Sequence, residues 1–154
     1  MIMKAKKSPL ILNSFLLLNH NYQFIQQVEV PFNIEIMEQY PIEIDFVIQE
    51  ANDEIYQLFT KIDINNIDKP LQGYKLFIEG VCVFSFDKTN EISETDKSAL
   101  LHISGISIGI NSLRNILSTV TSNGPFGKYT LPSIDVNQLL EDKRLSIEQQ
   151  KAPK

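Results

Sequence analysis

The chain has 154 residues, of which 43% are hydrophobic and 21% are charged, and its formal net charge is −5. This length suits one domain with a hydrophobic core of ordinary size. The acidic balance disfavours binding to a phosphate backbone, so we expect no nucleic-acid partner.

The chain begins with an expected N-terminal extension, residues 1–20, ahead of one domain at residues 21–146. The extension has a basic start and an apolar run, as signal peptides do. However, Asn13 and Ser14 interrupt the run, and no small-residue cleavage site follows. We therefore expect that no signal peptide is removed here.

Cysteine use and hydropathy both point to a cytoplasmic protein. Cys82 is the single cysteine, so an internal disulfide is excluded and a reducing compartment fits. The best candidate for a membrane span, residues 99–121, contains His102, Arg114 and four serines. We expect no segment that inserts into a membrane.

A period of two in the apolar residues predicts two strands, at residues 42–49 and 56–64. Asn52 and Asp53 lie between them and are typical turn residues. The two strands are therefore expected to form a hairpin.

Two further strands are expected on either side of this hairpin. Residues 74–87 are apolar on both faces, which indicates that both faces of that strand are covered. Residues 24–37 alternate in part, but Pro31 lacks the backbone donor that a central strand needs. We expect the 24–37 strand at an edge or a bulge of the sheet.

A long helix is expected after a polar linker at residues 88–96, because the hydrophobic period then changes. Ser93 or Thr95 can cap its first turn. The spacing predicts a helix of about six turns with one apolar stripe. The stripe consists of Ala99, Ile103, Ile106, Ile110, Leu113, Leu117 and Val120.

Gly105 and Gly109 lie four residues apart on another face of this helix. Each glycine weakens a helix by about 1 kcal/mol relative to alanine, so a closely packed neighbour would compensate. The alternative is a bent or interrupted helix.

Residues 122–135, SNGPFGKYTLPSID, contain two glycines and two prolines and cannot continue the helix. The same loop carries Phe126, Tyr129 and Leu131, whose side chains must either pack around the loop or be offered to a partner. We call this segment the crossover.

A second, short helix is expected after the crossover, capped by Ser133 or Asp135 and running to about Leu145. Residues 147–154 are polar and are expected to form a disordered tail. The order of four strands, long helix, crossover and short helix predicts an α+β fold with a four-stranded antiparallel sheet.

The sequence contains no recognisable catalytic or metal-binding motif. His20 and His102 stand alone, and there is no GxSxG, HExxH, paired CxxC or phosphate-binding glycine loop. Cys82 lies in an apolar strand without a basic neighbour, which is typical of a core residue. We expect no enzymatic activity, no cofactor and no metal.

Two segments resemble the SecB family of export chaperones. The first, YKLFIEGVCVFSFD at residues 74–87, is similar to a family strand that ends in a Gly-hydrophobic-Phe-Ser pattern. The second, at residues 111–140, is similar to the family segment around its crossover. The resemblance as a whole extends over about residues 20–145. Within the second segment, some matching positions are offset by one or two residues. The matching positions are Arg114, Ile116, Gly124, Leu131, Pro132, Ile134, Asp135 and Leu139.

The resemblance implies a homotetramer, a dimer of dimers, that holds unfolded polypeptides or preproteins in apolar grooves. It implies that the grooves are lined in part by the crossover. The expected groove residues are Phe126, Tyr129, Leu131, Phe84 and Phe86. The expected oligomer interface consists of Gly105, Gly109, Ile106 and Leu113.

The sequence departs from the family pattern at two places. Residues 110–115 replace a Pro-Tyr-Ala-Arg-Glu run at the start of the family's long helix. Phe77 stands where export members carry an acidic residue that docks the SecA motor, and Glu79 lies two residues on. The resemblance implies the SecA motor as one partner, and these departures count against it. The other expectation is a dedicated client such as an antitoxin or a mobile-element protein.

Three other interpretations stay open at this stage. The crossover side chains can simply fill the interface between sheet and helix. The protein can be an assembly subunit with one folded partner, or an enzyme of the hotdog thioesterase type. In a hotdog fold the long helix follows the first strand, whereas here it follows all the predicted strands.

Overall fold

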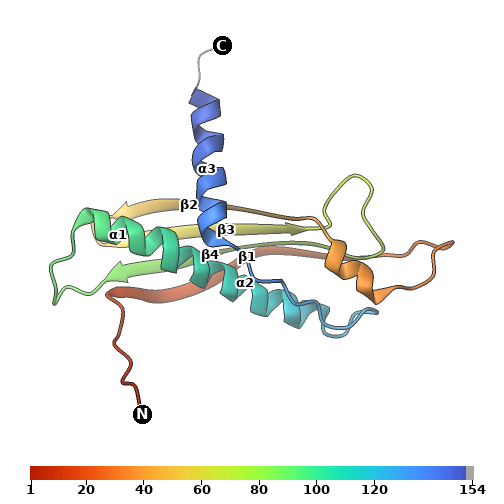
Figure 1. Ribbon diagram of the computed structural model, residues 1–154, viewed down its shortest axis with the longest axis horizontal. Helices are drawn as coiled ribbons and strands as arrows, with labels where there is room; N and C mark the ends of the chain where they lie inside the picture. The colour runs from red at the N-terminus through yellow and green to blue at the C-terminus, as the bar shows by residue number, and fades with distance from the viewer. Residues whose placement is uncertain (152–154) are drawn as a thin grey trace.

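A four-stranded antiparallel sheet carries a long, interrupted helix along one face and a second helix at one edge (Figure 1). The computed structural model describes residues 1–151; residues 152–154, the end of the predicted tail, lie outside the described part. The α+β class is confirmed. The elements are β1 (Leu10–Ile25), η1 (Ile34–Gln39), β2 (Ile42–Asn52), β3 (Ile55–Ile64), β4 (Gly73–Phe86), α1 (Glu94–Leu100), η2 (Leu101–Gly105), α2 (Ile106–Thr121) and α3 (Val136–Lys151).

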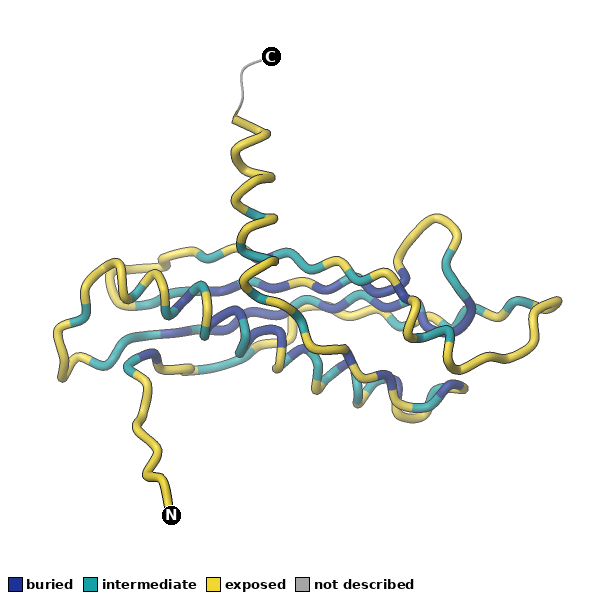
Figure 2. The backbone as a smooth tube through the Cα atoms, in the orientation of Figure 1, coloured by how far each residue is buried: buried dark blue, intermediate teal, exposed yellow. Residues whose placement is uncertain are grey.

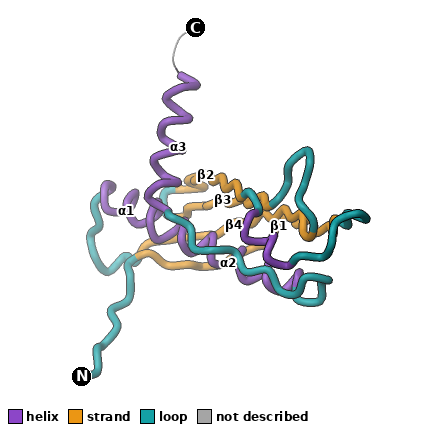
Figure 3. Tube along the Cα trace, turned by 45° about the vertical axis from the view of Figure 1, so that its right-hand side comes forward, coloured by secondary structure: helices purple, strands orange, loops and turns teal. Residues whose placement is uncertain are grey.

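The strands lie in the order β1-β4-β3-β2, and every neighbouring pair is antiparallel. The predicted hairpin is confirmed, because β2 pairs with β3 in continuous register from Ile42 opposite Ile64 to Glu50 opposite Tyr56. β4 is a central strand, which fits its apolar character. Figure 3 shows the strands as one layer, with α1 and α2 along one side of it.

The first strand is not at residues 24–37, as predicted, but at Leu10–Ile25, so that prediction is wrong. β1 contains two register shifts, between Leu12 and Ser14 and between Leu17 and Asn19. Each bulge reverses the alternation of side chains, which hides the period of two in the sequence. β1 therefore crosses the expected domain boundary at residue 20 and brings residues 10–20 into the sheet.

The hydrophobic core lies between the sheet and the helix that crosses it. Figure 2 shows that buried residues follow β3, β4 and one side of α2. Only one face of β4 is covered by helices within residues 1–151, so the expected cover on both faces is not found there. The largest fully buried side chains include Leu58, Ile62, Ile78, Phe84, Ile106, Leu113 and Leu117.

The long helix is interrupted, which was the alternative to a straight helix with a close neighbour at its glycines. The interruption is η2, a π-helical turn between α1 and α2. A π-turn takes in an extra residue and so rotates the faces of the helix on either side of it. Leu101 is consequently 4% exposed, whereas Ile103 of the predicted stripe is 51% exposed. Ile106, Ile110, Leu113 and Leu117 of the stripe are buried as predicted, whereas Ala99 is exposed and Val120 is only partly buried.

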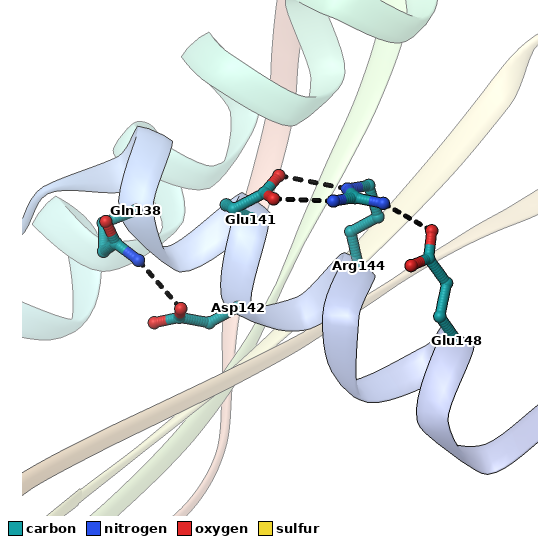
Figure 4. A network of polar contacts seen from close by, with 5 residues as sticks. All are labelled: Gln138, Glu141, Asp142, Arg144 and Glu148. Carbon is teal, nitrogen blue, oxygen red and sulfur yellow. Dashed lines mark hydrogen bonds and ion pairs between the residues drawn. The ribbon is translucent and has the colours of Figure 1, made fainter.

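The helix α3 projects away from the sheet and has no buried residue (Figures 1 and 2). Arg144 binds Glu141 through its Nε and Nη2 at 3.0 and 2.6 Å, and it also pairs with Glu148 (Figure 4). Such pairs at spacings of three and four support an exposed helix. α3 continues to Lys151, so residues 147–151 of the predicted disordered tail are helical.

Candidate functional site

The crossover is fixed to the end of the sheet by hydrogen bonds. The Phe126 N–H donates to Tyr74 Oη at 3.0 Å, and Tyr74 Oη donates to the Gly127 carbonyl at 2.7 Å. The Tyr129 N–H donates to Thr121 Oγ1 at 2.8 Å. Arg114 of α2 donates to the carbonyls of residues 131 and 132 at 3.0 and 2.9 Å. The loop is therefore held on both sides.

The three large crossover side chains point into the core. Phe126 and Tyr129 are each 4% exposed, and Leu131 is 1% exposed. The Phe126 ring lies 5.5 Å from the rings of Phe24 and Phe32, with both pairs edge-on. Burial raises the pKa of Tyr129 to about 12. In this conformation these residues fill the interface between sheet and helix and present little surface to a ligand.

The five expected groove residues do not come together in one chain. Phe126 packs near Tyr74, at the start of β4, whereas Phe84 and Phe86 lie at the end of that strand. Tyr74 and Phe86 are twelve positions apart along β4, which corresponds to about 40 Å of extended strand. Phe84 is fully buried, and Phe86 packs against Tyr56 with ring centroids 5.5 Å apart.

The expected interface residues on the long helix pack against the chain's own sheet. A Cβ at Gly109 would lie 2.9 Å from Thr60 Oγ1, and one at Gly105 would lie 3.5 Å from the Phe84 ring. Ile106 and Leu113 are fully buried. The close neighbour that the two glycines imply is therefore the sheet.

An open cleft of about 770 Å³ lies between the edge strand β2, the α1–η2 segment and α3. We call it the α3 cleft. Its apolar lining comes from all of these elements and from β3, and charged side chains stand around it. The apolar residues are Phe46, Val47, Ile48, Tyr56, Leu101, Leu140 and Ile147; the charged ones are Glu50, Glu94, Lys97, Lys143 and Arg144.

Lys143 holds α3 against β2 at the side of this cleft. Its Nζ lies 2.6 Å from Asp45 Oδ1 and 5.6 Å from the centroid of the Phe46 ring. Burial alone would raise the pKa of Asp45. Hydrogen bonds from Lys143 and from the Phe46 N–H outweigh this effect, so the pKa of Asp45 lies below its ordinary value.

Most charges around the α3 cleft are matched within the chain. Lys97 Nζ lies 2.8 Å from Glu94 Oε1, and the His102 Nδ1 lies 2.8 Å from the Ser98 carbonyl. Burial raises the pKa of Tyr56, and the negative charge of the Glu50 carboxylate raises it further. The α3 cleft thus offers apolar contact with a largely neutralised rim, which suits binding of an apolar segment.

The described residues hold no metal cluster, and residues 1–151 contain no helix that is long and apolar enough to cross a membrane. Cys82 lies in the core, where burial raises the pKa of its thiol to about 11. At neutral pH this thiol is protonated and a poor nucleophile.

Sequence reasoning missed the α3 cleft. The spacing of Leu140, Lys143 and Ile147 places them on one side of a helix, which was a usable signal. Nothing in the spacing says that this side faces β2, because Phe46 and Leu140 are far apart along the chain.

The sheet order, the helix along one face and the crossover define the class: this is a SecB-like fold. It is similar to a SecB-like chaperone from Mycobacterium tuberculosis, solved with a ChAD peptide from the HigA1 antitoxin. The TM-score is 0.57 and the identity 13%, over 82% of this chain and 88% of that one. A Streptococcus agalactiae protein of unknown function matches with a TM-score of 0.39 and 12% identity, over 80% of this chain and 97% of that one. No family model and no curated protein matches the sequence.

Proposed function

We propose that this protein is a cytoplasmic molecular chaperone, a holdase without enzymatic activity, that binds unfolded polypeptide segments in the α3 cleft. The observation that carries the proposal is the cleft itself: open, apolar, and rimmed by charges that are mostly paired. Apolar contact is non-directional and tolerates varied sequences, as a holdase requires. The SecB-like fold supports this function, since the M. tuberculosis neighbour is a chaperone solved with a peptide.

The crossover has a secondary role in this proposal. Phe126, Tyr129 and Leu131 contribute to a client site only if the loop leaves the sheet, because their side chains are buried when it is seated. We propose that the seated crossover mainly fixes the end of the sheet.

We propose a homo-oligomer, a dimer of dimers, in which two copies meet along their β1 strands. β1 is an edge strand, and such an edge pairs readily with another chain. Its apolar side chains are partly exposed. Between 41% and 52% of each remains exposed in Ile11, Leu12, Leu16, Leu17 and Leu18.

A dedicated client is the better-supported partner. The neighbour's peptide derives from an antitoxin, which supports a client of that kind. Docking of the SecA motor rests on an acidic strand residue, and Phe77 occupies that place. Preprotein export with SecA is the second possibility, and it would have to use Glu79, which lies opposite Lys61 of β3.

The test is suppression of aggregation when two unrelated proteins are diluted from denaturant. We expect the protein to suppress both, and Ile147→Asp to weaken this effect because Ile147 lines the α3 cleft. Leu145→Asp is the matched control, since Leu145 is 41% exposed, against 40% for Ile147, and does not line the cleft. Protection of neither protein contradicts a general holdase and favours an assembly subunit with one folded partner.

A further inference from the structure

The outer edge of β2 forms one wall of the α3 cleft. The sheet order ends at β2, so within the described residues this edge is paired with no strand. Phe46, Ile48 and Glu50 of β2 all line the cleft. The unpaired edge of this strand therefore borders the cleft.

The direction of these backbone groups follows from one hydrogen bond. The Phe46 N–H donates to Asp45 Oδ1 at 2.9 Å and so faces away from β3. In an antiparallel ladder the direction alternates from residue to residue. The register of β2 on β3 is continuous through Glu50, so the N–H and C=O groups of Ile44, Ile48 and Glu50 face the open edge as well.

Asp45 closes one part of this edge and leaves another open. Its carboxylate accepts a hydrogen bond from the Phe46 N–H. Lys143 holds that carboxylate in place, with Nζ 2.6 Å from Asp45 Oδ1. Beyond this point, the edge from Ile48 to Glu50 opens into the α3 cleft. Edge strands with open groups readily accept a further strand.

We infer that a client segment binds as an added β-strand on the Ile48–Glu50 edge, an inference that rests on the proposed holdase function. Residues opposite each other in paired strands share a face, so the client residue opposite Ile48 points into the cleft toward Leu101 and Leu140. Backbone pairing does not depend on side chains, which explains how one site can hold different segments.

The charge at the edge defines the chemistry of the segment. Lys97, Lys143 and Arg144 each have an acidic partner, whereas none of the ion pairs within residues 1–151 uses Glu50. Glu50 is exposed and lies on the face that looks into the cleft. The fitting occupant is an extended apolar segment with a Lys or Arg opposite Glu50.

The probe is a fluorescent peptide of about nine residues, the length of an ordinary strand, with alternating Val and Thr and one central Lys. Two further series of this peptide carry N-methyl groups on alternate residues. In one series the methyl groups are on the odd positions, and in the other they are on the even positions. One series loses the N–H groups that face β2, and the other loses those that face away. We expect one series to bind at least about tenfold more weakly than the other.

Two variants locate the pairing on the protein. Ile48→Pro removes an edge N–H inside the cleft, and Ile44→Pro removes one on the closed side of Asp45. Both residues are half-buried on the same face of β2, and proline is tolerated at sheet edges. We expect Ile48→Pro to weaken binding of the unmethylated peptide and Ile44→Pro to leave it nearly unchanged, with both variants checked for an unchanged thermal transition.

The outcomes separate this inference from the holdase proposal. Equal binding of the two N-methylated series, or equal losses in both proline variants, overturns strand addition while aggregation suppression can persist. If the unmethylated peptide does not bind, strand addition is also overturned. Failure of the holdase proposal shows separately, as loss of suppression for both diluted proteins.

Discussion

Lys143 of α3 and Asp45 of β2 form the ion pair that joins the C-terminal helix to the edge of the sheet, with Nζ 2.6 Å from Oδ1. The residues are 98 positions apart in sequence. Because Asp45 also accepts the Phe46 N–H, the same carboxylate positions the helix and covers part of the strand edge. The position of α3, and hence the width of the α3 cleft, depends on this contact.

Replacing Lys143 by Met is expected to loosen α3 without unfolding the domain. Both partners are partly exposed, so the pair contributes at most about 1 kcal/mol to the free energy of unfolding. Hydrogen exchange of the Phe46 amide should accelerate, because its acceptor is no longer held. Arg144→Met is the control, since Arg144 bonds within α3 only. Equal acceleration in both variants would show that the pair does not position Asp45.

The contribution of this pair should depend on pH in an acidic window. The pKa of Asp45 in the folded protein lies below 3.8, its ordinary value. A carboxyl group with a lowered pKa contributes stability above its unfolded pKa and loses it as the pH falls through the folded pKa. The difference in unfolding free energy between wild type and Lys143→Met should thus stay constant from pH 7 to about pH 4 and shrink below it. A loss centred near pH 6 would assign the effect to another group.

The crossover aromatics are expected to act on stability before they act on binding. Phe126→Ser should lower the free energy of unfolding by about 3 to 5 kcal/mol, because the ring is buried among other aromatic rings. Phe32→Ser removes a ring that contacts Phe126 but is 60% exposed, and should cost less than about 1 kcal/mol. Urea unfolding of both variants checks this order. A stable Phe126→Ser protein with weak client binding would instead support a crossover that lines the groove.

The parts of the fold that were predictable have an uninterrupted period. β2 and β3 alternate clearly enough to predict, β4 is recognisable as a long run that is apolar on both faces, and α2 keeps its stripe from Ile106 to Leu117. β1 was missed because bulges reset its alternation near Asn13 and Leu18. The π-turn likewise moved Ile103 off the buried stripe.

The candidate site was harder to predict because tertiary packing creates it. The sequence marked the crossover aromatics as unusual, but burial of a side chain in a loop depends on what the loop packs against. The α3 cleft depends on a helix crossing a strand edge, and the Lys143–Asp45 contact that fixes the crossing joins residues with no local relation. The period of a segment carries no information about such a contact.

Gly109 is expected to resist substitution, although alanine is the better helix former. A Cβ there would lie 2.9 Å from Thr60 Oγ1, a buried hydroxyl without a hydrogen-bond partner among the described residues. Gly109→Ala should therefore destabilise the fold, while Gly105→Ala, with its nearest atom at 3.5 Å, should be neutral or gain up to about 1 kcal/mol.

The double variant Gly109→Ala, Thr60→Ala tests the cause of this expected loss. Removing the hydroxyl also removes the close contact, so the double variant should recover most of the stability that Gly109→Ala loses. Thermal unfolding of the four proteins completes the cycle. Strictly additive effects would mean that the two positions do not interact.

The exposed leucines of β1 should control assembly rather than folding. Leu16 and Leu18 are 52% and 49% exposed, so replacing both by Lys should cost the isolated chain little. If two copies meet along β1, the added charges repel each other across the symmetric contact, and sedimentation velocity should show a smaller species than the wild type. Ile67→Lys, at a loop position that is 40% exposed, is the control and should leave the mass unchanged. An unchanged mass for the β1 variant would place the contact between copies elsewhere on the chain.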